Sequence, residues 1–437
     1  MDKKISVLAI FCAIFLFSFF LNPFANAESS AGSSKPTLIW WAAVGDTVGS
    51  SPTVVNGVLY IGTYNGTVYA INAQNGKLVW SSSPGPGDDS TPVVANGVVY
   101  ISSIGSGTVY ALDAKTGVVV WSKQIMPSYL TAPTVVNGVV YVGTFNFGGI
   151  FALRASTGAL LWNSTALDSD WGVAEWIAPH SGVDSQPTVV NGVVYFGSED
   201  GLTYAFDASS RQMLWSINST DGSVYSSPVV TAGVVYVTVC DFAGPGNEGS
   251  GLVYAIDAST GALIWNVTVA PLQNECPVVV GGVVYVSGFN GNVYALNAAN
   301  GDQIWNYTAG NYVEYKSYVG EFMSSTPKVV SGVVYVDSMD ENVYALNAAH
   351  GYLLWSYTVG GSIDSAPAVT DGIVYVGSEN GNVYALSVSS ASTSTPTSPT
   401  TTPSPTLTVT AVISVVVIIS VSLLIYRKHR KTANLSK

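Results

Sequence analysis

The stretch from Ser50 to Trp80 reads SSPTVVNGVLYIGTYNGTVYAINAQNGKLVW, and a version of it, STPVVANGVVYISSIGSGTVYALDAKTGVVVW, follows from Ser90 to Trp121. Units that recur in phase about every 40 residues indicate a repeat architecture. The prolines that open the units are Pro52, Pro92, Pro133, Pro187, Pro228, Pro277, Pro327 and Pro367. The tryptophans that close them are Trp80, Trp121, Trp162, Trp215, Trp265, Trp305 and Trp355. There is thus one more opening proline than closing tryptophan.

Each unit is expected to form four antiparallel strands. PTVV is the first, and Asn-Gly or a near equivalent (Asn56-Gly57 is one example) makes a two-residue hairpin turn into VVYVG. The second segment is rich in β-branched and aromatic residues, as in a sheet covered on both faces. NVYALN and VVVW complete the unit, separated by turns such as Ala114–Gly117. Four such strands make one blade of a β-propeller.

The start of the repeat region supplies the missing strand. The last unit, which begins near Ser365, runs into a different composition near Ser390 without its tryptophan strand. Leu38–Trp40 reads LIW and matches the ALIW that ends at Trp265, so it is a fourth strand without a blade. We therefore predict an all-β fold: an eight-bladed propeller over residues 36–390, closed by an N-terminal strand at 38–42 that leaves no open edge.

The units resemble the quinoprotein-type, or PQQ-like, β-propeller repeat in its non-enzymatic branch. The pattern Ala-x-Asp-x-x-Thr-Gly-x-x-x-Trp is intact from Ala111 to Trp121 and from Ala255 to Trp265, and relaxed elsewhere. The resemblance implies that the tryptophans, Trp40 included, dock between neighbouring blades. A large rigid ring repeated at one register also favours packing over chemistry.

The long insertions are expected on one face of the propeller. Because successive strands reverse direction, second-to-third turns and blade-to-blade links share a face. Residues 163–184 and 306–324 are long links, and residues 240–251 enlarge one second-to-third turn. A plain face opposite an elaborated one favours binding through the latter.

Four carboxylates recur in phase on that face. Asp89, Asp184 and Asp364 each stand three residues before an opening proline, and Glu275 stands two before Pro277. First strands line the channel of a propeller, so these side chains are candidates for a ring at its mouth. Such a ring would suit a hard cation such as calcium or a polar ligand. Local turn capping and simple solvation are the alternatives.

Cys240 and Cys276 fall on the same face of adjacent predicted blades, and Cys12 lies in the N-terminal segment. Outside the cell, an oxidising setting favours a disulfide between the first two, and apolar packing is the alternative.

The two ends of the chain predict a cell-surface protein. Residues 1–27 have Lys3 and Lys4, an apolar run and a final Ala-Asn-Ala, as in an export signal, with an uncleaved anchor as the alternative. Residues 391–406 form a Ser/Thr/Pro stalk. Residues 407–426 carry no charge and suit a transmembrane helix, and the basic stretch that follows places residues 427–437 in the cytoplasm. The predicted location is a single-pass cell membrane protein with its ectodomain outside.

The predicted ectodomain, residues 28–406, is acidic. It holds 8 Lys+Arg and 26 Asp+Glu, a formal charge of −18, which disfavours nucleic acid as a partner. It also carries the glycosylation sequons at Asn65, Asn163, Asn218, Asn266 and Asn306, each a weak signal on its own.

Three functions are compatible with these features. The first is a non-catalytic platform that binds an extracellular protein or glycan. The second, a quinone-dependent dehydrogenase, is disfavoured because the adjacent cysteine pair and the haem motif of the enzymes that the repeat resembles are missing. The third is a structural or adhesive coat. We expect no catalytic residue and no cofactor, and the fold alone does not choose between platform and coat.

Overall fold

The computed structural model describes residues 35–87, 90–103, 105–125, 129–145, 149–164, 182–219, 222–240, 251–269, 272, 276–288, 291–309 and 325–388. The chain divides into two units, residues 1–390 and 391–437, and the second lies outside the described residues. The predicted signal, stalk, transmembrane segment and tail lie outside them as well. Within the described ranges, no helix is long and apolar enough to cross a membrane.

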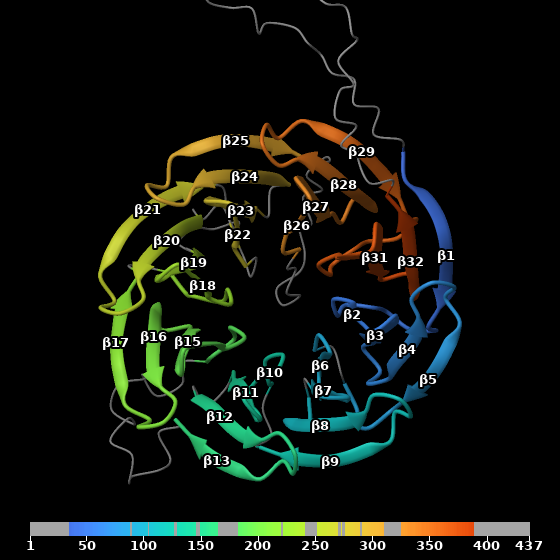
Figure 1. The fold of residues 1–437 in the computed structure, drawn as a ribbon, viewed down its shortest axis with the longest axis horizontal. Helices are drawn as coiled ribbons and strands as arrows, with labels where there is room; N and C mark the ends of the chain where they lie inside the picture. The colour runs from blue at the N-terminus through green and yellow to red at the C-terminus, as the bar shows by residue number, and fades with distance from the viewer. Residues whose placement is uncertain are drawn as a thin grey trace, which may run out of the picture. The chain divides into compact units, whose positions relative to one another are not determined.

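The described residues form eight four-stranded antiparallel sheets arranged as the blades of a propeller, as predicted (Figure 1). Blades one to four contain β2 Thr53–Val55, β3 Val58–Gly62, β4 Val68–Asn72 and β5 Leu78–Ser82; β6 Val93–Ala95, β7 Val98–Ser102, β8 Thr108–Asp113 and β9 Val119–Gln124; β10 Thr134–Val136, β11 Val139–Thr144, β12 Gly149–Arg154 and β13 Leu160–Asn163; β14 Thr188–Val190, β15 Val193–Gly197, β16 Leu202–Asp207 and β17 Met213–Asn218. Blades five to seven contain β18 Val229–Thr231, β19 Val234–Cys240, β20 Gly251–Asp257 and β21 Leu263–Val269; β22 Val278–Val280, β23 Val283–Ser287, β24 Asn292–Asn297 and β25 Gln303–Thr308; β26 Lys328–Val330, β27 Val333–Asp337, β28 Asn342–Asn347 and β29 Leu353–Thr358. Blade eight contains β30 Ala368–Thr370, β31 Ile373–Ser378, β32 Asn382–Ser387 and, from the other end of the chain, β1 Thr37–Ala43.

The N-terminal strand closes the ring. β1 pairs antiparallel with β32, with Leu38 opposite Leu386 and Trp40 opposite Ala385. Val44 N then donates to Gly381 O at 2.9 Å, which extends the pairing beyond the strand. The predicted closure is confirmed, and in Figure 1 the blue β1 lies beside the red β32.

The two-residue hairpin turns have the backbone that their sequence requires. Asn56 and Gly57 both have positive φ, 51° and 76°, which is the conformation of a type I′ turn. Asn tolerates this region and Gly enters it without steric cost. The turns are therefore tight, and they hold each first strand close to the second.

The closing tryptophans dock onto the next blade. Trp265 Nε1 of blade five donates to the Ala298 carbonyl of blade six at 3.0 Å, and Tyr236 OH donates to the same carbonyl at 3.1 Å. A Cβ on Gly301 would lie 2.7 Å from the Trp265 ring. The Ala and Gly of the repeat are thus the acceptor and the seat of the preceding tryptophan. The same indole-to-carbonyl bond is made by Trp40, Trp80, Trp121, Trp215 and Trp305.

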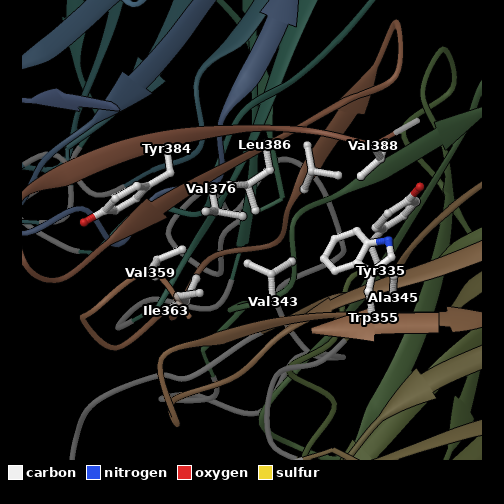
Figure 2. Close-up of a cluster of buried hydrophobic side chains, with 11 residues drawn as sticks. Tyr335, Val343, Ala345, Trp355, Val359, Ile363, Val376, Tyr384, Leu386 and Val388 are labelled. Atoms are coloured by element: carbon white, nitrogen blue, oxygen red, sulfur yellow. The ribbon is translucent and has the colours of Figure 1, made fainter. Parts of the chain in front are cut away.

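The core lies between blades rather than within them. Figure 2 shows one such cluster, to which Tyr335, Val343 and Trp355 come from blade seven and Val376 and Leu386 from blade eight. Each blade is covered on both faces in this way, which explains why the second and third strands are apolar throughout. Each blade thus packs against the next through one hydrophobic cluster.

Candidate functional site

The turns and links of the propeller define two unlike faces. We call the face with second-to-third turns and blade-to-blade links the loop face, and the opposite one the turn face. On the turn face, Asp113 Oδ1 accepts from Lys115 N at 3.0 Å and from Thr116 N at 2.9 Å. The hydrogen bond from the Thr116 side chain, helped by these amides, lowers the pKa of Asp113. This carboxylate therefore stabilises its own turn through Oδ1.

The eight first strands surround the centre of the ring (Figure 1). Threonine side chains join some of these strands to the next: Thr53 Oγ1 donates to Pro92 O at 2.6 Å, and Thr188 Oγ1 donates to Pro228 O at 2.6 Å. Residues just before a first strand are therefore at the loop-face end of this inner ring.

Asp184 stands at that end in blade four and lies near a second carboxylate. Gly182 N donates to Glu199 Oε2 at 2.9 Å, and Glu199 N donates to Gly182 O at 3.0 Å, so the link is tied to the β15–β16 turn. Oδ2 of Asp184 is buried and has no hydrogen-bond partner among the described residues. Burial, and then the charge of Glu199, raise the pKa of Asp184 to about 8. We call Asp184 and Glu199 the acid pair.

Tyr225, in the link that leads to blade five, belongs to the same neighbourhood. Burial raises its pKa to about 12, and the charges of Glu199 and Asp184 act in the same direction. Ser223 Oγ donates to the Glu199 carbonyl at 2.9 Å and so attaches this link to the acid pair. Because these pKa values keep both protons in place near pH 7, the Asp184 carboxyl and the Tyr225 phenol each carry an O–H donor as well as acceptor oxygens.

Blade eight repeats the pair in sequence and backbone. Asp364 and Glu379 occupy the positions of Asp184 and Glu199, and Glu379 N donates to Ser362 O at 3.0 Å. Blades four and eight stand half a ring apart. The loop face therefore carries two acidic positions on opposite sides of the channel.

Only two of the four predicted channel-mouth carboxylates can be placed. Asp184 and Asp364 are described, whereas Asp89 and Glu275 lie outside the described residues. Across the ranges that the structure covers, no three acidic, histidine or cysteine residues converge to hold a metal ion. The calcium site thus stays a prediction. Glu199 was missed because its turn position shows no pattern until the repeats are aligned on Asp184.

A second buried carboxylate, Asp337, was also missed. It ends β27 and is 6% exposed, and neither of its oxygens has a hydrogen-bond partner among the described residues. Burial raises its pKa well above the usual range. Blade two has Ser102 at this position, whose hydroxyl donates to Thr131 O at 2.6 Å. Alignment of the second strands would have singled out Asp337, since the other blades have Gly, Ser or Thr at this position.

In the structure Cys240 and Cys276 are not joined by a disulfide, and their pairing stays a prediction. Cys240 ends β19 and its Sγ donates to Leu272 O at 2.7 Å. Cys276 precedes β22, and its Sγ accepts from Ser227 N at 3.2 Å. The two sulfurs thus bond to backbone atoms of different segments.

These cysteines also test the quinone that the repeat implies. The enzymes that this repeat resembles carry an adjacent cysteine pair beside the cofactor. In this chain the cysteines are Cys12, Cys240 and Cys276, and the two described thiols each bond a different backbone atom. By this criterion the residues of this chain do not fit a quinone cofactor.

The fold and the docked tryptophans define an eight-bladed propeller of PQQ-like repeats. The family model described as outer membrane protein assembly factor BamB matches residues 33–244, 242–326 and 316–394, and the chain belongs to this family. The comparison with curated protein sequences gives no significant match.

Solved structures share the fold at low sequence identity. BamB from Moraxella catarrhalis superposes with a TM-score of 0.63 and 18% identity, over 81% of this chain and 98% of that one. The quinohemoprotein alcohol dehydrogenase from Comamonas testosteroni gives 0.63 and 16%, over 83% and 78%. The computationally designed Ika8 protein gives 0.65 and 14%, over 79% and 99%. An assembly factor, an enzyme and a design therefore share one scaffold, and the fold alone shows no activity.

Proposed function

We propose that this protein is a non-catalytic binding platform, exported and held at the cell surface, that engages a protein or glycan through its loop face. The observation that carries the proposal is the acid pair. The Asp184 Oδ2 is buried with no hydrogen-bond partner among the described residues, which costs stability unless something supplies a partner. A ligand with cationic or amide groups would supply it, and the acidic ectodomain would attract a basic ligand.

Family membership supports the same conclusion. The family is described as an assembly factor, and assembly is a task of protein contact. The turn face, with its short turns and self-satisfied carboxylates, offers fewer groups to a partner. The loop face carries the acid pair and its counterpart in blade eight, and the sequence predicts the longest links on the same face.

Photo-crosslinking from the two faces tests the proposal. A crosslinking side chain replaces Glu379 on the loop face or, as the control, Lys115 on the turn face, in the full chain on the cells that produce it. We expect adducts from Glu379, reduced when Asp184→Asn and Glu199→Gln are added, and none from Lys115. Equal adducts from both faces, or adducts that ignore the acid pair, would contradict the platform.

Two other functions remain as alternatives to this proposal. A quinone-dependent dehydrogenase would reduce a dye when the full chain is given the quinone, calcium and an alcohol or sugar. A structural coat would give crosslinks only between copies of this chain. Either result would replace the platform.

A further inference from the structure

The outermost strand of every blade is an exposed edge. β1, β5, β9, β13, β17, β21, β25 and β29 each pair on one side only. Soluble proteins commonly place charges or proline on such edges to prevent pairing with another chain. Here Lys123 is the one charged residue in all eight of these strands, and none contains proline.

Exposed apolar side chains further favour pairing of these edges with another chain. A bulge before each tryptophan turns the preceding residues outward, so that Leu263 and Ile264 of β21 are 47% and 46% exposed. Val118 and Val120 of blade two are 63% and 55% exposed. Uncharged β-branched segments of six or seven residues on an edge are prone to cross-chain pairing.

Four of the five sequons fall on these same edges. Asn163 ends β13 and Asn218 ends β17, while Asn266 lies inside β21 and Asn306 lies inside β25. The four blades are consecutive, three to six. Asn65, by contrast, lies in the turn between β3 and β4 on the loop face.

Strand register presents two of the sequons to solvent. Trp265 is buried, so alternation places Asn266 and Thr268 together on the opposite, exposed face of β21. Asn306 and Thr308 are exposed in the same register of β25, one blade further on. The amide and the hydroxyl that a sequon requires thus stand side by side on the rim.

We propose that Asn266 and Asn306 carry N-linked glycans that cover the outer edges of blades five and six. The inference is independent of the platform function and rests on the export predicted from the N-terminal segment. Asn Nδ2 bonds to the anomeric carbon of a lipid-phosphate-linked oligosaccharide, supplied with its transferase by the host. The sugar–phosphate bond breaks, the phosphate leaves with its electron pair, and the amide loses one proton. A bulky hydrophilic glycan would prevent these edges from pairing with another chain, as charged side chains do on other edge strands.

Peptide mapping tests the attachment. The full chain is made in a host that exports and N-glycosylates, and the occupancy of each sequon is measured by mass. We expect glycans on Asn266 and Asn306, each lost in Asn266→Gln or Asn306→Gln. Unmodified Asn266 and Asn306 in an exported chain would overturn the proposal.

A variant that should gain a glycan tests presentation by strand register independently of the loss variants. Ser356 and Thr358 of β29 occupy the register of Asn306 and Thr308, and both threonines donate to a neighbouring Asn Oδ1 at 2.6 Å. Ser356→Asn makes the blade seven segment identical to that of blade six, and we expect it to add one glycan. A correctly folded variant with no added glycan would count against presentation by register.

Association of the chains tests the covering role. Light scattering compares the parent with the Asn266→Gln/Asn306→Gln pair and with Asn65→Gln, which changes a sequon away from the edges. We expect the pair to associate at a lower protein concentration than the parent, and Asn65→Gln to behave like the parent. Equal association of all three would refute the covering role.

Discussion

Docking of each tryptophan onto a glycine of the next blade predicts a specific loss of stability in Gly301→Ala. Gly301 has φ of +78°, and a Cβ there would lie 2.7 Å from Trp265 Cε3. The substitution therefore imposes two costs, a left-handed conformation on alanine and a clash with a ring held in place by the Ala298 carbonyl.

A glycine in the same blade separates the two costs. Gly282 has φ of +79°, and a Cβ there would meet nothing within 4 Å. Gly282→Ala should lose only the conformational part, about 1–2 kcal/mol. Gly301→Ala should lose the same amount and about 1–3 kcal/mol more from overpacking.

Urea unfolding of the full chain, followed by tryptophan fluorescence, measures both variants against the parent. We expect Gly301→Ala to unfold at the lower urea concentration, by a margin that corresponds to the extra cost. Equal midpoints for the two variants would show that a Cβ at Gly301 does not clash with the Trp265 ring, which would contradict docking of the tryptophan onto this glycine.

Three further changes probe other parts of the structure. Asp184→Asn should gain stability relative to the parent as the pH rises from about 4 to about 8. Between these values the folded parent holds a proton on Asp184 that the unfolded chain has lost, so the free energy of unfolding of the parent falls as the pH rises. Urea midpoints of the two proteins that move in parallel with pH would contradict this. Asp337→Ser should stabilise the propeller by roughly 1–3 kcal/mol near pH 7, since a hydroxyl replaces a buried carboxyl that has no hydrogen-bond partner within the described ranges; a lower melting temperature would contradict this expectation. Trp40→Ala should destabilise by about 3–5 kcal/mol, whereas the neighbouring exposed Trp41→Ala should change unfolding by less than about 0.5 kcal/mol, and similar losses would exclude a docking role for Trp40.

The architecture could be predicted from the sequence because the pattern of one blade recurs eight times. One opening proline in excess, together with the unpaired LIW at Leu38–Trp40, predicted both the number of blades and the partner of β1. The Ala and Gly after the third strand recur with the same periodicity, and in six of the described blades they contact the tryptophan of the blade before. Blade four departs from this pattern, because Arg211 stands in place of the glycine.

The candidate site was less predictable because it consists of departures from the repeat. Asp184 was found by its phase, but Glu199 lies in a turn whose composition varies between blades, and only the folded link brings it to Gly182. Asp337 occupies a position that holds Gly, Ser or Thr in the other blades, and only the folded structure shows that its side chain is buried. Cys240 and Cys276 were predicted to pair from their shared face and an oxidising setting, and in the structure each sulfur bonds a different backbone atom.

The sorting of loops onto one face and of sequons onto the rim depends on closure of the ring by β1. A pair of cysteines at Ala43 and Asn382, which the structure places opposite each other, tests it directly in the full chain. The matched control places the second cysteine at Asn342, the same position one blade earlier. After mild oxidation and proteolysis, closure predicts a disulfide-linked pair of peptides for Ala43→Cys/Asn382→Cys and none for Ala43→Cys/Asn342→Cys. A link in the control, or none in the test pair, would contradict the closed ring.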